Sequence, residues 1–244
     1  MLLISSVSSM KVTDLSALPF IQRALMRPQD PRAVLSFFFG SNYYGDEIEA
    51  VKDGSCLKTM SELWYGGGPE YDKLCGTFQD TVRRVGGKEV NEEWTTTIDG
   101  VVAQMICCDQ LSRNIFRGTP EAFAYEETAL EAANELTDNL LGAKALVGPF
   151  YPPYLSFMVV ACMHSEAQSN HERAMRILRH AKDEYPNLID DWNFQEKFEQ
   201  DHKDVIDRFG RYPHRNKLYG RENTPDEDAW LRDTENLPGW AKSQ

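Results

Sequence analysis

The chain has 244 residues, of which 41% are hydrophobic and 11% aromatic, which is enough apolar surface for a packed core. Its formal net charge of −12 argues against nucleic acid and anionic membranes as partners, because such binding depends on an excess of Lys and Arg. No apolar run approaches the ~20 residues that cross a bilayer. We therefore expect a soluble protein.

The cysteines indicate a reducing compartment. They number five, Cys107 and Cys108 are adjacent, and no pair has C-x-x-C spacing. This pattern predicts free thiols in a packed core, and hence a cytoplasmic protein. The first ten residues lack the basic segment and the cleavage site of a secretion signal, and Met10 is an alternative start.

In the first half of the chain, apolar residues recur every three or four positions, which is the period of an α-helix. Asp30 and Pro31 predict the start of a helix that Gly40 ends. Similar patterns run from 69 to 86 and from 94 to 106, and Thr119-Pro120 begins another. The glycine-containing stretch 40–68 is expected to be a loop, with Gly66 to Gly68 as a hinge.

The second half repeats this pattern. Residues 154–163 are nearly all apolar, which predicts a buried helix, and an amphipathic helix follows that Pro186 ends. The sequence from Thr224 to Glu227 is a capping box that opens a last helix. A long helix ending at Gly210 precedes it, with these residues expected to face the core: Trp192, Phe194, Phe198, Val205, Ile206 and Phe209.

No stretch alternates apolar and polar residues as a half-buried strand does, so the predicted fold class is all-α. No linker-like change in composition divides the chain, and one domain of antiparallel helices is expected. We expect an irregular segment over residues 1–30, a helical domain over 31–235 and a C-terminal tail over 236–244.

The first polar cluster lies at the end of the helical pattern 94–106. Asp109 follows Met105 by four residues, so it lies on the apolar face, where an unpaired carboxylate would be costly to bury. Arg113 is one turn further on, and either Arg113 or a basic group elsewhere in the chain is the expected partner. Asn114 and Arg117 follow it and complete the cluster.

The second cluster lies around MHSE. His164, Gln168 and His171 are spaced to share one face if the buried helix continues, and Glu166 would then project elsewhere. These residues either cap a helix or join a core network, or they supply a general base or metal ligand at His164.

The third cluster is the stretch 202–221, where six Lys and Arg against two Asp give a formal charge of +4, so the rest of the chain carries −16. His202 lies on the apolar face of its helix, where a hydrogen-bonded core histidine is expected. Pro213 prevents a regular helix, so a compact turn should carry Arg211, His214, Arg215 and Asn216. These arginines either pair with acidic residues of the chain or hold a bound anion.

Three motifs resemble the DUF924 family, a group of unknown function with a tetratricopeptide-like helical fold. They are DQLSRNIFRGTPEAFA from Asp109, MHSE from Met163, and DRFGRYPHRNKLYGRENTPDEDAWL from Asp207. The resemblance covers about residues 31–232 and implies an all-helical, tetratricopeptide-like fold, but no reaction. The chain departs from the family pattern at Ser112, Ala167 and His171.

The leading hypothesis is a pocket for a small anionic ligand that bears a phosphate or carboxylate, with turnover left open and no catalytic residue assigned. The alternative is a tetratricopeptide-like scaffold for a peptide or protein partner, with the polar clusters structural. A metal-dependent hydrolase using His164, Glu166, His202 and His214 has no recognised ligand spacing, so no metal or cofactor is predicted. The candidate binding residues are Asp109, Arg113, Asn114, Arg117, His164, Glu166, His202, Arg208, Arg211, His214, Arg215, Asn216 and Arg221.

Overall fold

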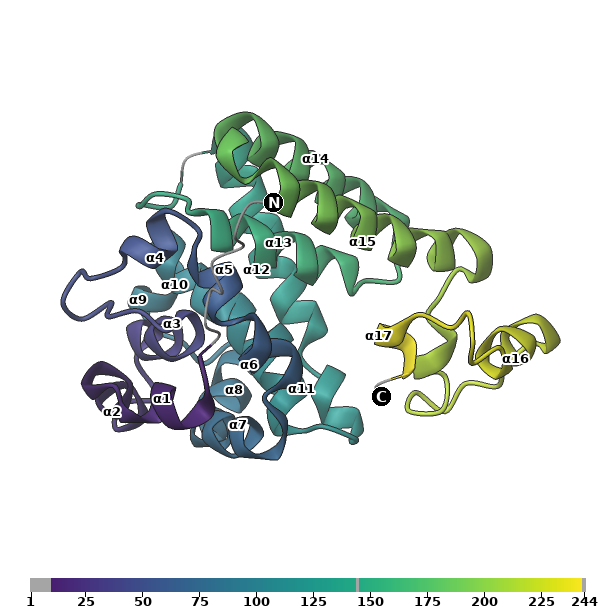
Figure 1. The fold of residues 1–244 in the computed structure, drawn as a ribbon, viewed down its shortest axis with the longest axis horizontal. Coiled ribbons are helices and arrows are strands. Elements are labelled where there is room, and N and C mark those ends of the chain that lie inside the picture. The colour runs from purple at the N-terminus through teal and green to yellow at the C-terminus, as the bar shows by residue number, and fades with distance from the viewer. Residues whose placement is uncertain (1–9, 144, 243–244) are drawn as a thin grey trace, which may run out of the picture.

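The protein is built of helices (Figure 1). The computed structural model describes residues 10–143 and 145–242, and within these ranges it has two isolated β-bridges, Asn42 with Glu47 and Thr97 with Val147, but no strand. The all-α prediction is confirmed. None of the helices in these ranges combines the length and the apolar character that a membrane-spanning helix requires.

The α-helices, in chain order, are α1 (Val12–Ala17), α2 (Pro19–Leu25), α3 (Pro31–Phe39), α4 (Glu49–Lys52), α5 (Cys56–Thr59), α6 (Ser61–Gly66), α7 (Gly68–Cys75), α8 (Gln79–Gly86), α9 (Glu92–Thr95), α10 (Ile98–Met105), α11 (Ser112–Ile115), α12 (Glu126–Asp138), α13 (Pro152–Met163), α14 (Gln168–Glu184), α15 (Ile189–Phe209), α16 (Pro225–Arg232) and α17 (Gly239–Lys242). The segment Ile106–Leu111 is π-helical, and Asn139–Ala143 has a π-helical pattern that Gly142 interrupts with a φ of 139°. Short 3₁₀ turns occupy Gly76–Phe78, Pro120–Phe123, Pro186–Leu188 and Pro213–Arg215.

Helix ends follow the capping residues that the sequence places there. The side chain of Asp30 accepts a hydrogen bond from the backbone N–H of Arg32, and Gly40 ends α3 in the left-handed conformation with φ +61°. Gly210 ends α15 in the same way, with φ +68°. At the start of α16, Thr224 and Glu227 form the expected capping box.

The core is formed where α3, α10 and α13 meet. Helix α3 packs on α2 and α10, α10 packs on α12, and α13 packs on both α12 and α14. Aromatic rings fill the space between them: Phe38 lies 4.9 Å from Phe157 and 5.1 Å from Trp64, centroid to centroid. All but one of the residues of α13 are buried, as its apolar sequence predicts.

The N-terminal part of the chain is more regular than expected. Helices α1 and α2 lie within residues 1–30, where the sequence indicated an irregular segment, and Leu15, Ile21 and Ala24 are fully buried. Three short helices, α4 to α6, occupy much of the stretch expected to be a loop. Residues 1–9 of the expected segment lie outside the described ranges, and the limits of the domain remain a prediction.

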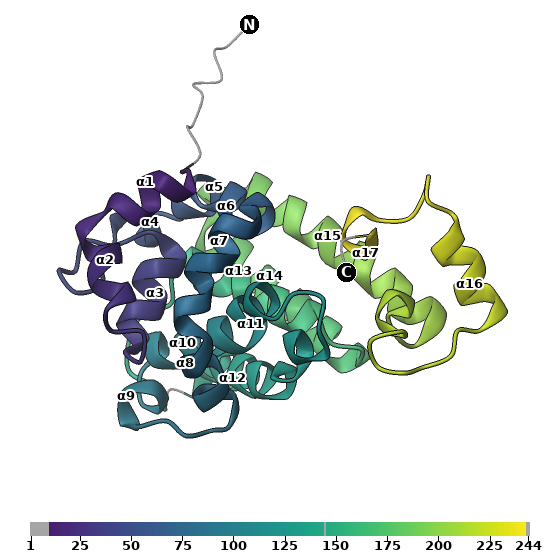
Figure 2. The same ribbon diagram turned by 90° about the horizontal axis from the view of Figure 1, so that it is seen from below.

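Helix α15 leads from the main body to a C-terminal lobe, defined here as residues 210–242. The lobe projects from one end of the molecule in both ribbon views (Figures 1 and 2). It shares a small core with the end of α15, in which Phe209 and Trp230 pack against Tyr212 and against Val205 and Ile206 of α15. Residues 236–242 of the expected C-terminal tail belong to this lobe, since α17 buries Ala241 and packs Trp240 on the same core; residues 243–244 lie outside the described ranges.

One residue predicted to be in the core is not. Phe194 on α15 is 73% exposed, although its ring stacks on that of Phe198. Trp192, Val205 and Ile206 on the same helix are buried as expected.

Candidate functional site

Three distant segments bring acid, imidazole and guanidinium groups together. Asp109 lies in the π-helical segment that extends α10, and its Oδ1 is 2.7 Å from Nδ1 of His164, at the end of α13. The same oxygen is 3.2 Å from Nη2 of Arg113. The predicted pairing of Asp109 with Arg113 is confirmed, and Asp109 is almost fully buried.

Glu126, at the start of α12, joins these groups to the C-terminal lobe. Its Oε1 is 2.6 Å from Nη2 of Arg113 and 3.1 Å from Nη1 of Arg215. Arg215 also donates to the backbone carbonyl of His164, at 2.9 Å. We call Asp109, Arg113, Glu126, His164 and Arg215 the central cluster; it contains two carboxylates and two guanidinium groups.

An aromatic ring orients the two arginines. The guanidinium carbon of Arg113 lies 4.8 Å from the centre of the Phe123 ring, and that of Arg215 lies 5.2 Å from it. Tyr219 packs against the same ring and donates to Oε2 of Glu126, at 3.1 Å. The planar guanidinium groups are thus held in fixed directions rather than left free to rotate.

The protonation states in the central cluster follow from burial and charge. Burial alone would raise the pKa of Asp109, but the charges of His164 and Arg113 outweigh it and hold that pKa well below its usual range. Burial, with the nearby charge of Arg113, lowers the pKa of His164 below its usual 6.5, and Asp109 only partly opposes this. At neutral pH, Asp109 is therefore ionised.

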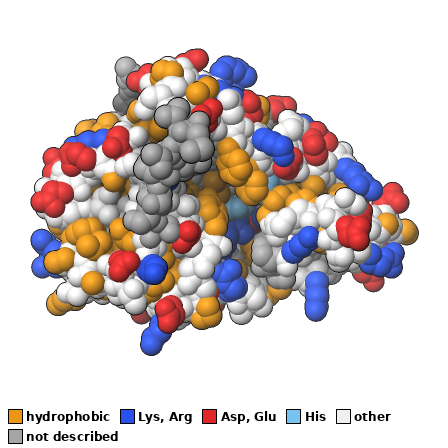
Figure 3. Space-filling model, in the orientation of Figure 1, with side chains coloured by type: hydrophobic (Ala, Val, Ile, Leu, Met, Phe, Trp, Pro, Cys, Tyr) orange, Lys and Arg blue, Asp and Glu red, His pale blue; other side chains and the backbone are white. Residues whose placement is uncertain are grey.

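Three nitrogen atoms of the central cluster have no hydrogen-bond partner among the described residues and still reach solvent: Nη1 of Arg113, Nη2 of Arg215 and Nε2 of His164. Figure 3 shows a hollow between the helical body and the C-terminal lobe, with His and basic side chains at its floor and hydrophobic side chains around it. The central cluster therefore has two hydrogen-bond donors and an imidazole nitrogen that the protein itself does not use.

Tyr65 on α6 is a large aromatic side chain that is 72% exposed. Tyr65 lines a cavity of about 660 Å³ formed by residues within 10–12 and 61–67.

The MHSE segment is a turn, not a continuing helix. Helix α13 ends at Met163 and α14 begins at Gln168, so the prediction that His164, Gln168 and His171 share one helical face is wrong. The hydroxyl of Ser165 accepts hydrogen bonds from the backbone N–H of Ala167 and the side chain of Asn170, which satisfies groups at the start of α14.

His171 forms a separate buried pair. Its Nδ1 is 2.7 Å from Oε1 of Glu199, its Nε2 donates to the carbonyl of Ser165 at 3.0 Å, and neither His171 nor Glu199 is exposed. Burial raises the pKa of Glu199, and the hydrogen bond from His171 opposes this. The pair holds the turn through the backbone carbonyl of Ser165.

The other candidate residues of the cationic segment mostly bind carboxylates of the chain itself. Arg221 makes a two-point ion pair with Glu166, at 2.7 and 2.8 Å. Arg211 makes another with Glu227, which Asn216 also contacts. These interactions fix the turn that presents Arg215 to the central cluster.

Asn114 and Arg117 lie on a neighbouring surface. Both donate to the carboxylate of Asp72 on α7, at 2.8 Å from Asn114 and at 3.0 and 3.1 Å from Arg117. Arg208 joins neither the central cluster nor the contacts with Asp72. Its side chain is exposed on α15, and its guanidinium lies over the ring of Phe209.

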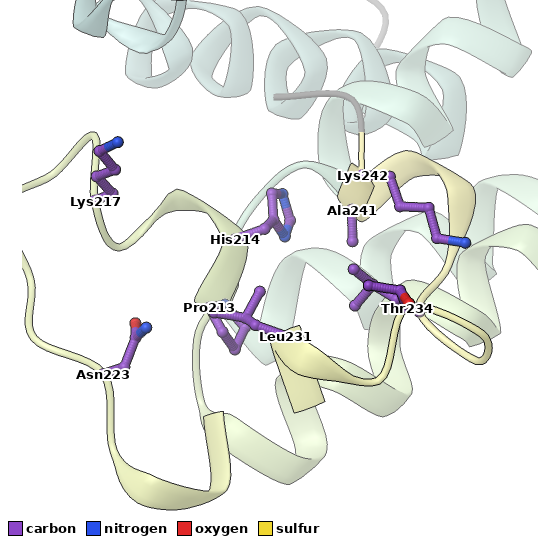
Figure 4. A pocket seen from close by; sticks show the side chains of 9 residues that line it. Pro213, His214, Lys217, Asn223, Leu231, Thr234, Ala241 and Lys242 are labelled. Atoms are coloured by element: carbon purple, nitrogen blue, oxygen red, sulfur yellow. The ribbon is translucent and has the colours of Figure 1, made fainter. Parts of the chain in front are cut away.

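His202 and His214 lie on the side of the C-terminal lobe. Nδ1 of His202 donates to the carbonyl of Phe198 at 2.8 Å, and its ring stacks on that of Trp240 at 3.9 Å, so the expected core histidine is observed. His214 lines a cavity of about 490 Å³ together with Pro213, Leu231 and Ala241 (Figure 4). Burial lowers the pKa of each of these histidines to about 3.

The alternative of a metal-dependent hydrolase requires a set of metal ligands close together in the fold. Within residues 10–143 and 145–242, no group of three or more His, Cys, Asp and Glu side chains is arranged to hold a metal ion. Glu166, one of the proposed ligands, is instead bound to Arg221 and to the backbone N–H of Tyr212.

Sequence reasoning did not assign Glu126, Phe123 or Tyr219 to the site. Glu126 resembles any acidic residue in the first turn of a helix, and only the excess of arginines in the motifs signals that a carboxylate is needed nearby. Phe123 lies inside the first motif, but its contact with two arginines depends on the tertiary fold.

Comparison with known proteins places the chain in a family. The family model described as "Bacterial protein of unknown function (DUF924)" matches residues 34–235. A solved structure, described as a protein of unknown function, ATU0120, from Agrobacterium tumefaciens, is similar with a TM-score of 0.55 and 23% identity, over 74% of this chain and 98% of that one. This likeness shows the fold alone. No curated protein matches the chain. Since the family model covers most of its length, the chain belongs to the DUF924 family.

Proposed function

We propose that the hollow binds a small molecule with a phosphate or carboxylate group, and that Arg113 and Arg215 hold this group. The observation that carries the proposal is the pair of solvent-facing guanidinium nitrogens, Nη1 of Arg113 and Nη2 of Arg215, that have no partner among the described residues. Guanidinium groups bind anionic oxygens through several N–H donors in one plane.

The surroundings support binding in two ways. Both arginines are largely or fully buried, at 17% and 3% side-chain exposure, so a bound anion would be screened less by water than at a surface arginine. Both also pack on Phe123, so little side-chain entropy remains to be lost on binding. The carboxylates of Asp109 and Glu126 already balance the formal charges of the two arginines, which favours a weakly charged ligand group over a highly charged one.

Thermal unfolding and calorimetry with inorganic phosphate, and with acetate, test the proposal. Ionic strength is held constant with chloride, so that only specific binding raises the melting temperature. We expect phosphate or acetate to stabilise the wild type, and to stabilise Arg113→Lys and Arg215→Lys much less, because lysine keeps the charge but loses the planar set of donors.

Arg117→Lys is the matched control, because Arg117 is an exposed arginine bound to Asp72 and lies outside the central cluster. This variant should respond like the wild type. If neither anion stabilises the wild type beyond chloride, or if all three variants respond equally, the proposed site is wrong.

A further inference from the structure

The C-terminal lobe packs around a different hydrophobic core from that of the helical body. The core that the lobe shares with the end of α15 is formed by Val205, Ile206 and Tyr212, with Phe209, Trp230 and Trp240 packed against it. The main core includes Trp192, near the other end of α15, but none of these six residues. A segment with a separate apolar core can keep its structure while it moves relative to the rest of the chain.

One attachment of the lobe to the body is Glu166, in the turn between α13 and α14. Its carboxylate accepts two hydrogen bonds from Arg221, at 2.7 and 2.8 Å, and one from the backbone N–H of Tyr212, at 2.9 Å. The hydroxyl of Tyr212 donates to the backbone carbonyl of Met163 close by, at 2.5 Å. These contacts between lobe and body are polar.

The other attachment is Glu126, at the start of α12. Arg215 donates to its Oε1 and Tyr219 to its Oε2, both at 3.1 Å. Apolar contact comes from the ring of Tyr219, 6.0 Å from that of Phe123, and from Leu218, which is partly buried against the main core. Charged and polar groups thus make most of the specific contacts that hold this side of the lobe.

Such a boundary opens more readily than a hydrophobic core unfolds. A hydrogen bond that is lost on opening is replaced by one to water, so its net contribution is small, whereas unfolding a core exposes its apolar surface. Helix α15 stays attached further back, where Glu199 is 2.7 Å from His171 and both are fully buried. The unit that can move is therefore the lobe with the last turns of α15.

The proposed anion site is divided between this unit and the body. Arg113 lies on α11 of the body, whereas Arg215 lies on the 3₁₀ turn Pro213–Arg215 of the lobe. The hollow lies between the body and the lobe (Figure 3). An anion that accepts hydrogen bonds from both guanidinium groups would bridge the boundary and stabilise the closed arrangement.

We propose that the C-terminal lobe opens away from the body as one unit, and that an anion binds in the hollow when the lobe is closed. The opening needs no ligand, because it follows from the contacts of the chain itself. The second part rests on the proposed function, and it makes the lobe the element that controls entry and release of the ligand.

Hydrogen exchange of the Tyr212 amide, followed by NMR, measures the opening. This N–H donates across the boundary to Glu166, so it exchanges when the lobe opens even if the lobe stays folded. Tyr219→Phe keeps the ring on Phe123 and removes the hydrogen bond to Glu126. If the lobe moves as one unit, this change at the other attachment should speed exchange of the Tyr212 amide about 2–10-fold.

Glu126→Gln weakens the contacts of both Arg215 and Tyr219, so it should speed the same exchange further, by about 10-fold or more. Amides of α10 and α13 should keep their wild-type rates in both variants. Glu196→Gln is the control, because Glu196 pairs with Lys182 at 2.7 Å, between α14 and α15 and away from the lobe. It should leave exchange of the Tyr212 amide unchanged.

Two results would overturn the opening of the lobe as a unit. An unchanged Tyr212 amide in both Tyr219→Phe and Glu126→Gln would show that the two attachments break independently. An equal acceleration in α10 and α13 would show that the amide exchanges only when the whole protein unfolds.

Inorganic phosphate separates this inference from the proposed function. At about ten times its Kd, phosphate should slow exchange of the Tyr212 amide about 10-fold relative to chloride at equal ionic strength, and Arg215→Lys should lose most of this effect. If the variants behave as expected but phosphate does not bind, the anion site fails and the opening stands. If phosphate binds without slowing this exchange, binding does not require the closed lobe, and the second part of the proposal is wrong.

Discussion

Arg221 and Glu166 are 55 residues apart in the chain and meet through two parallel hydrogen bonds, Nη1 to Oε2 at 2.7 Å and Nη2 to Oε1 at 2.8 Å. The same carboxylate accepts the backbone N–H of Tyr212 at 2.9 Å. One glutamate of the MHSE turn therefore fastens both ends of the loop that carries His214 and Arg215.

A double-mutant cycle on Glu166→Gln and Arg221→Lys measures this attachment. Each single change should lower the free energy of unfolding by about 1–3 kcal/mol, because it breaks hydrogen bonds between charged and only partly exposed groups. The two effects should be less than additive when measured by urea unfolding. Additive effects would show that the two residues act independently.

Asp109→Ala tests whether the central cluster also supports the fold. The change leaves Arg113 with Glu126 as a partner, so we expect a loss of about 3 kcal/mol, at the lower end of the range for breaking a buried pair. Arg117→Ala, at an exposed ion pair, should cost less than about 1 kcal/mol. Chemical denaturation compares the two, and a fully stable Asp109→Ala protein would exclude a structural role for this carboxylate.

The buried His202 predicts how stability changes with pH. Burial lowers the pKa of His202 to about 3, so in the folded protein it stays neutral where the unfolded chain, with the usual 6.5, takes up a proton. The unfolded state then binds more protons, and stability falls as pH falls from about 6.5 towards 3.

Urea unfolding of the wild type and of His202→Phe, at about pH 6.5 and about pH 5.5, measures the contribution of this residue. Phenylalanine keeps the stacking on Trp240 but cannot be protonated. The loss of stability over this interval should be about 1 kcal/mol smaller in the variant. Equal losses would mean that His202 is not shielded from solvent as its environment indicates.

The cysteines provide a test of the core. All five are buried free thiols, and burial raises the pKa of Cys162 to about 12 and that of Cys107 well above its usual value. We expect no reaction with a thiol reagent at about pH 8 in the folded protein, and reaction of all five after denaturation. Rapid modification of any cysteine in the native state would contradict the packing around it.

Local features were predictable from the sequence because local chemistry determines them. Asp30 and Gly40 bound α3, and Thr224 with Glu227 begins α16, since capping depends on residues within one turn of the helix end. The pairing of Asp109 with Arg113 is local in the same sense, because the two are one turn apart.

The site as a whole was only partly predictable. His164 was placed on a continuing helix because the apolar pattern does not reveal that the Ser165 hydroxyl would satisfy backbone and side-chain groups at the start of α14. Glu126 and Arg215 lie 89 residues apart, and no spacing rule connects them. Arg208 was grouped with the other arginines by charge alone, although its position on α15 faces solvent.

The π-helical segment Ile106–Leu111 makes the chemistry of the site depend on the length of the chain at this point. Each residue of an α-helix turns the chain by about 100°, and a π-helical turn holds one residue more than an α-helical one. Deleting a single residue here would rotate Asp109 and Arg113 together about the axis of α10, whose buried side chains anchor it, and would separate Asp109 from the histidine. Homologues are therefore best aligned by the register of this turn: a chain one residue shorter could keep every motif and still present different groups to the hollow.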